Sequence, residues 1–165
     1  MPRNLIQAAR EYASRNRLVV REALGAGIHG LVQVVQGDAA LGGTALKVFH
    51  SEEFFRRELA VYERLKAAQV REIRGFAVPQ LIRADNQLLA VEMTVVERPF
   101  VLDFAGAYLD DTEPRFDDEV WEMWEADKRE KFGPRWPEVQ AVLAALESYE
   151  IHMLDVNPGN VAFRD

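Results

Sequence analysis

The sequence predicts an α+β fold, in which an antiparallel five-stranded sheet with one main helix precedes a reduced, mostly helical part. The first observation is the order of elements in residues 1–96: helix, three strands, helix, two strands, which suits an antiparallel sheet better than repeated βαβ units. The second is a change of character after residue 96, where prolines separate two helical segments. We therefore expect a single domain over 1–165, with an N-terminal lobe (1–96) and a reduced C-terminal lobe (97–165).

The elements of the first lobe follow from apolar periodicity and turn residues. Ser51, followed by two glutamates, is a typical helix start, because early acidic residues suit the helix dipole. The expected elements are a helix over 4–15, strands over 18–24, 31–35 and 44–49 with turns over 25–30 and 38–43, a helix from Ser51 to about Ala68, and strands over 80–84 and 87–95.

The second lobe is expected to be mainly helical. Residues 116–131 are acidic at their start and basic at their end, as a helix dipole favours, and Pro137 suits the first turn of a helix that runs to Tyr149. A short strand over 151–154, a loop over 155–160 and residues 161–163 complete the chain. Trp121, Met123 and Trp124 are expected to pack the first of these helices.

Composition and charge exclude several classes of function. The net charge of −7 disfavours general nucleic-acid binding and adsorption to anionic membranes, both of which need clustered Lys and Arg. Cysteine is absent, so there is no disulfide, thiolate metal site or Cys nucleophile. Neither an apolar run of about 20 residues nor a secretory signal is present. We expect a soluble, cytoplasmic protein without nucleic-acid or membrane partners.

The first chemical motif is a glycine-rich turn, Gly25-x-Gly27-x-x-Gly30, followed by Val32. A dinucleotide-binding loop would open a helix, whereas a β-branched strand follows this one. Two interpretations stay open. The glycines can serve a hairpin that needs positive φ angles, or they can let the backbone approach phosphate groups.

Two further motifs contain charged and amide side chains that could bind a ligand: Lys47 with Glu58, and Asp155 with Asn160. Lys47 lies between apolar residues of a strand, and Glu58 in the next helix can supply its counter-charge; separately, both can be surface residues. Asp155 and Asn160 flank a loop stiffened by Pro and Gly. This loop can be an Asx-rich turn, or Asp155 can orient a hydroxyl proton while Asn160 offers an amide oxygen to a cation.

Together these motifs resemble the protein kinase superfamily, in its bacterial minimal or atypical forms. The glycine-rich loop, strand lysine, helix glutamate and Asp-x-x-x-x-Asn loop occur in family order. The intervals from Gly30 to Lys47 and from Asp155 to Asn160 also match. The resemblance covers roughly residues 18–163.

The resemblance implies a role for each matching residue. Asp155, Lys47 and Asn160 would be catalytic, with Asp155 orienting the acceptor hydroxyl and Asn160 holding magnesium. Backbone groups near Met93 to Val96 would bind adenine. The residues implied to bind ATP are Gly25, Gly27, Gly30, Val32, Lys47, Glu58, Met93 and Val95.

Three departures qualify this resemblance. The family's His-Arg-Asp reads Met153-Leu154-Asp155 here, and Asn157 stands where protein kinases usually carry Lys. The magnesium-binding Asp-Phe-Gly segment would lie beyond Asp165. Either another acid of this chain replaces that aspartate, or a partner protein supplies it, or the protein does not transfer phosphate.

Two main hypotheses follow. The first is an ATP-dependent phosphotransferase acting on a protein Ser/Thr or a small-molecule hydroxyl. The second is a pseudokinase that binds nucleotide or regulates a protein partner; a third reading takes the motifs as coincidental turns. His29 is expected to be solvated at the loop tip, and His50 and His152 to form local hydrogen bonds.

Overall fold

The α+β architecture is confirmed by a computed structural model that describes residues 3–37 and 42–165. The turn predicted over 38–43 lies largely outside the described residues. Along the chain the elements are α1 (Leu5–Arg15), β1 (Leu18–Ala26), β2 (Gly30–Gly37), β3 (Thr44–Phe49), α2 (Glu52–Ala67), β4 (Glu72–Ile73), β5 (Phe76–Ala77), β6 (Leu81–Asp85), β7 (Ala90–Thr94), β8 (Phe100–Val101), β9 (Ala107–Leu109), the 3-10 turn Asp110–Thr112, α3 (Asp118–Phe132), the 3-10 turn Gly133–Arg135, α4 (Trp136–Glu147), β10 (Ile151–Met153) and β11 (Val161–Ala162).

The main sheet has five antiparallel strands, as the sequence predicts, and their spatial order is β1-β2-β3-β7-β6. The hairpin of β1 and β2 ends in the glycine-rich turn, where Ala26 pairs with Leu31. In the centre, Lys47 of β3 lies between Val32 of β2 and Val91 of β7. The sheet therefore holds Lys47 on a strand that is paired on both sides.

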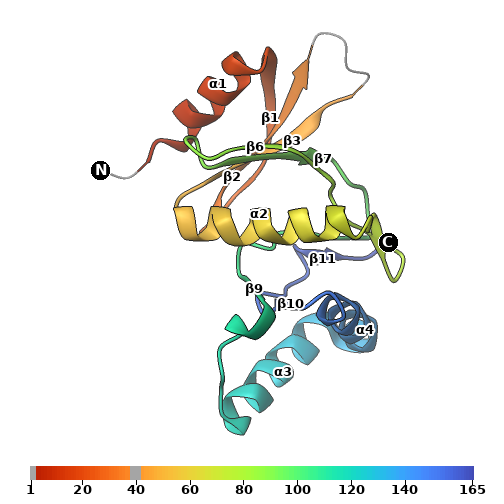
Figure 1. The fold of residues 1–165 in the computed structure, drawn as a ribbon. Helices are drawn as coiled ribbons and strands as arrows, with labels where there is room; N and C mark the ends of the chain where they lie inside the picture. Colours follow the sequence, from red (N-terminus) through yellow and green to blue (C-terminus); the bar gives the residue numbers. More distant parts are fainter. Residues whose placement is uncertain (1–2, 38–41) are drawn as a thin grey trace.

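Helices cover both faces of this sheet (Figure 1). On one face α1 buries Ala9 and Tyr12, and the Tyr12 hydroxyl donates to buried Glu92 at 2.8 Å. On the other face lies α2, whose Ser51 cap accepts from the Phe54 amide as expected. The buried side chains of α2 join the larger core cluster, which continues into α4 and β10.

The second half packs beneath α2 around two small sheets (Figure 1). One sheet pairs β11 with β8 and β8 with β5, and the other pairs β10 with β9. Trp124 of α3 donates its indole N–H to the Leu154 carbonyl at 3.0 Å. This bond ties α3 to the segment that leads into Asp155.

Several predicted details differ from the structure. Strands β4, β5, β8 and β9 were not predicted, because segments of two or three residues are too short for a period-2 pattern. Leu88 and Leu89 belong to a turn, and β7 begins at Ala90. Met123 was expected to pack its helix, but its side chain is 68% exposed because it lies on the outer face of α3.

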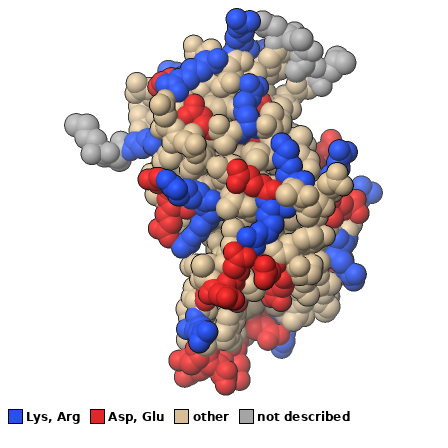
Figure 2. Space-filling view, viewed as in Figure 1, with Lys and Arg blue, Asp and Glu red and all other residues tan. Residues whose placement is uncertain are grey.

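The surface contains charges of both signs. Figure 2 shows acidic side chains gathered at the lower end of the viewed face, where Figure 1 places the start of α3, with basic side chains scattered above. Among the described residues, no helix combines the length and apolar character needed to cross a bilayer.

Candidate functional site

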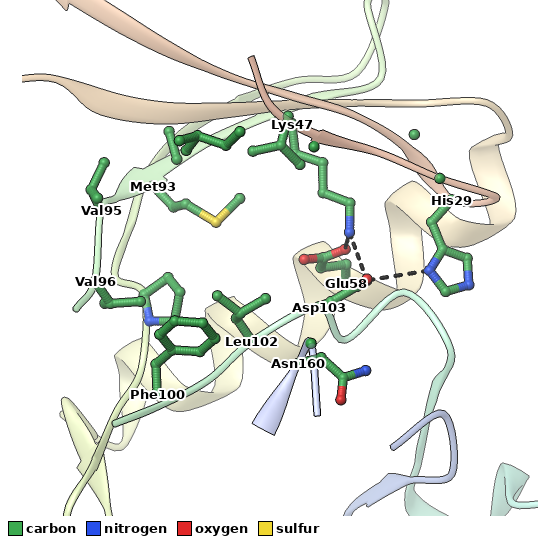
Figure 3. A pocket seen from close by; sticks show the side chains of 18 of the residues that line it. His29, Lys47, Glu58, Met93, Val95, Val96, Phe100, Leu102, Asp103 and Asn160 are labelled. Carbon is green, nitrogen blue, oxygen red and sulfur yellow. Dashed lines mark hydrogen bonds and ion pairs between the residues drawn. The ribbon is translucent and has the colours of Figure 1, made fainter. Parts of the chain in front are cut away.

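A cavity of about 740 Å³ lies between the five-stranded sheet and the segments around β8 and β11. Its wall contains residues from the glycine-rich hairpin, β3, α2 and β7, and from the loop after β10 (Figure 3). The structure thus brings together in one cavity all the residues singled out from the sequence: Gly25, Gly27, Gly30, Val32, Lys47, Glu58, Met93, Val95, Asp155 and Asn160.

Lys47 is the centre of the charge arrangement. Its Nζ donates to Glu58 Oε2 at 2.6 Å and to Asp103 Oδ1 at 2.7 Å, and the residue is only 4% exposed. Burial alone would lower the pKa of the Lys47 ammonium, but the two carboxylates outweigh it and raise this pKa. Lys47 therefore stays charged inside the cavity, and the snorkelling alternative is wrong.

Glu58 lies on the inward face of α2 and is 1% exposed. Its burial raises the pKa of its carboxyl group, while the adjacent Lys47 ammonium acts in the opposite direction. Since the ion pair spans β3 and α2, the position of the helix is tied to the position of the lysine. The alternative of a solvated helix acid is wrong for Glu58.

The three glycines of the hairpin differ in what the fold requires of them. A Cβ on Gly30 would lie 2.2 Å from the Val48 carbonyl oxygen, so Gly30 allows β2 to approach β3. Gly25 and Gly27 have no neighbouring atom within 4 Å of such a Cβ and do not have positive φ. The positive-φ explanation is therefore wrong for all three, and side-chain packing does not account for Gly25 and Gly27.

The loop from Asp155 to Asn160 is fixed by its own hydrogen bonds. Asn160 Nδ2 donates to the Asp155 carbonyl at 2.6 Å, and Asn160 Oδ1 accepts from the Asn157 amide at 2.9 Å. The Asx-turn interpretation is therefore correct for the backbone. The same turn leaves the Asp155 carboxylate free to line the cavity, with its side chain 43% exposed.

Asp103 is the site residue that the sequence reasoning missed. It follows β8 at a backbone φ of +63°, a conformation that Asp tolerates better than most residues and that is frequent at functional sites. Burial acts to raise the pKa of its carboxyl group, but the Lys47 ammonium and His29 outweigh that effect and lower this pKa. The available signal was an apolar run, Phe100-Val-Leu102, that ends in an acid.

The neighbouring strands place Asp103 close to Asn160. β8 and β11 pair antiparallel, with Val101 opposite Val161, and the Leu102 amide donates to the Asn160 carbonyl at 2.9 Å. A hard cation prefers oxygen ligands such as a carboxylate and an amide carbonyl. Asp103 and Asn160 both line the cavity, and the described residues contain no group of three or more His, Cys, Asp or Glu arranged for a metal.

His29 differs from the prediction. It was expected to be solvated, yet it is 7% exposed because the hairpin tip bends inward and packs its ring on Phe54 at 4.7 Å between centroids. Its Nδ1 lies 3.2 Å from Asp103 Oδ1, and its Nε2 lies 3.8 Å from Asp155 Oδ2. The other two histidines lie outside this group of charges. His152 Nδ1 lies 3.2 Å from Glu113 Oε2. His50 is exposed, and its backbone N–H donates to the His29 carbonyl.

No protein-family model, curated protein or solved structure matches this chain.

Proposed function

We propose that this protein binds ATP in the cavity and transfers its terminal phosphate to a hydroxyl group, on a protein Ser or Thr or on a small molecule. The observation that carries this proposal is the buried Lys47 ammonium, held by Glu58 and Asp103 in a cavity that the glycine-rich hairpin also lines. A fixed cation without a solvent shell stabilises phosphate charge strongly, because no reorganisation is needed when the charge develops.

Asp103 supports a permuted form of the kinase-like arrangement. The resemblance expects an Asp-Phe-Gly acid after Asn160, whereas Asp103-Phe104-Ala105 precedes it in the chain. An antiparallel pair such as β8 and β11 brings the two residues together in either chain order. Asp103 is therefore our choice for the acid that holds the magnesium ion.

Each wall of the cavity has a role in this proposal. Gly25 and Gly27 allow backbone amides to approach the phosphates, and the edge from Met93 to Val96 receives the adenine ring. Asp155 orients the acceptor hydroxyl and accepts its proton as the new O–P bond forms and the bond from the terminal phosphorus to the bridging oxygen breaks, so that ADP leaves. Asp103 and Asn160 would hold a magnesium ion, which when bound neutralises charge on the phosphates.

Phosphate transfer from labelled ATP, measured by mass spectrometry with the protein itself and generic Ser/Thr peptides as acceptors, tests the proposal. We expect Asp155→Ala to lower the rate by about 10²-fold or more, and Asp103→Asn to lower it similarly. Asp118→Asn, a substitution of an exposed acid at the start of α3, serves as the matched control. Equal transfer by Asp155→Ala and the unmodified protein would contradict the proposal.

A nucleotide-binding or regulatory module without transfer is the second candidate. One observation favours it: Asp103 Oδ1 already accepts from Lys47, and Asn160 Oδ1 from Asn157, so both proposed cation ligands have protein partners. Magnesium distinguishes the two candidates. If ATP raises the melting temperature equally with magnesium and with a chelator, and no transfer occurs, the second candidate is correct.

A further inference from the structure

The tip of the glycine-rich hairpin is held through the His29 side chain and through the bond from the His50 backbone N–H to the His29 carbonyl at 3.1 Å. Ile28 is 79% exposed, whereas the adjacent His29 is buried against Phe54 of α2. The hairpin closes on itself through the bond from the Gly27 amide to the Gly30 carbonyl at 3.0 Å. Among the side chains of residues 26–30, that of His29 is thus the one that is buried.

The imidazole ring lies beside both functional carboxylates. Its Nδ1 is 3.2 Å from Asp103 Oδ1, the same oxygen that accepts from Lys47 (Figure 3). Its Nε2 is 3.8 Å from Asp155 Oδ2. Glu58 reaches the same group of charges through Lys47. The ring of His29 therefore lies against the same Asp103 oxygen that accepts from Lys47.

We propose that His29 is a positioning residue that fastens the glycine-rich hairpin over the two carboxylates in the nucleotide-free protein, and that magnesium–ATP displaces it from Asp103. This inference rests on the proposed function. Magnesium–ATP and His29 compete for the Asp103 carboxylate. The apparent affinity for magnesium–ATP therefore equals the affinity of the open form multiplied by the fraction of molecules that are open. Release of His29 then frees the hairpin to cover the phosphates.

Hydrogen exchange in the nucleotide-free protein tests the fastening directly. We expect His29→Ala to speed exchange of the amides of residues 26–30 about tenfold, because the hairpin opens more often. Ile28→Ala, a change at the exposed neighbour, is the control and should leave these amides unchanged. His29→Asn retains a donor near the position of Nδ1 and should restore part of the protection. Unchanged exchange in His29→Ala would overturn the proposal.

Calorimetric binding of magnesium–ATP tests the displacement. His29→Ala should bind magnesium–ATP about three- to tenfold more tightly than the unmodified protein, with His29→Asn in between. Weaker binding by His29→Ala would overturn the proposal, since His29 would then be a ligand contact. If the unmodified protein binds no nucleotide, the proposed function and the displacement both fail, whereas the exchange experiment still decides whether His29 fastens the hairpin.

Discussion

At the scale of single residues, Lys47 decides both the stability and the chemistry of the cavity. It is the only cation within 4 Å of either Glu58 or Asp103 among the lysines and arginines that the structure describes. A buried carboxylate that loses its counter-charge is costly, because the charge is then left uncompensated away from water. The energetic effect of the triad is therefore larger than that of the exposed ion pairs along α2 and α3.

The first prediction concerns removal of the Lys47 ammonium. Lys47→Met leaves the carboxylate of Glu58 buried without its partner, so we expect the free energy of unfolding to fall by about 3–5 kcal/mol. Urea denaturation followed by circular dichroism measures this. Adding Glu58→Gln should recover part of the loss, while Glu63→Gln on the exposed face of α2 should recover none. A loss below about 1 kcal/mol would contradict the buried triad.

The second prediction is a pH dependence that originates at Asp103. Its carboxyl pKa is lowered in the folded state, so its contribution to stability is present above the unfolded pKa of about 4 and is lost as pH falls through the folded pKa. The difference in unfolding free energy between the unmodified protein and Asp103→Asn should be largest near pH 7. It should shrink as the pH falls below about 4. A difference that stays constant from pH 7 to 3 would rule this out.

At the scale of elements, the β1–β2 hairpin separates structural from functional glycines. Gly30 permits β2 to lie against β3, whereas no neighbouring atom restricts Gly25 or Gly27. A ligand approaching the hairpin backbone would supply that restriction. Substitution at these positions therefore distinguishes folding from binding.

The third prediction follows from this difference. Gly30→Ala should lower the free energy of unfolding by about 1–3 kcal/mol, because its Cβ would overlap the Val48 carbonyl oxygen and force the strands apart. Gly25→Ala and Gly27→Ala should leave the melting temperature of the nucleotide-free protein nearly unchanged. Both should reduce the increase in melting temperature that magnesium–ATP causes. Equal destabilisation by all three would show that every glycine serves the fold.

At the scale of the whole molecule, one continuous core joins the two halves. Phe104, which is fully buried, packs edge-on against Tyr62 of α2 at 5.5 Å between ring centroids. On the surface, Arg64 of α2 binds Asp110 and the carbonyl of Glu150. The two halves are therefore expected to unfold together.

The fourth prediction tests this coupling. Phe104→Ala should lower the free energy of unfolding by about 3–5 kcal/mol, because it leaves a large cavity where the two halves meet. Tryptophan fluorescence reports the second half, and far-UV circular dichroism reports the whole chain. Both transitions should shift together to lower temperature, while Ile28→Ala should shift neither. Separate transitions in Phe104→Ala would show that the halves fold independently.

The sequence was most informative where a local pattern has a local cause. The Ser51 cap, the position of Pro137 in the first turn of α4 and the strand from Thr44 to Phe49 were all predicted, because caps and periodicity act within a few residues. Asp103 was missed and His29 was wrongly predicted to be solvated for the opposite reason. Their roles depend on contacts with residues more than 50 positions away, and no local pattern encodes them.

The sequence by itself determined the α+β class and the order of the main-sheet elements along the chain, since these follow from alternation and capping. Only the tertiary structure decided that Asp103, which precedes Asp155 in the chain, lies beside Lys47 and that His29 bends inward between the two acids. The physical reason is that antiparallel pairing of β8 with β11 joins distant segments without regard to their order. The buried Lys47 ammonium then pairs with the carboxylates of Glu58 and Asp103.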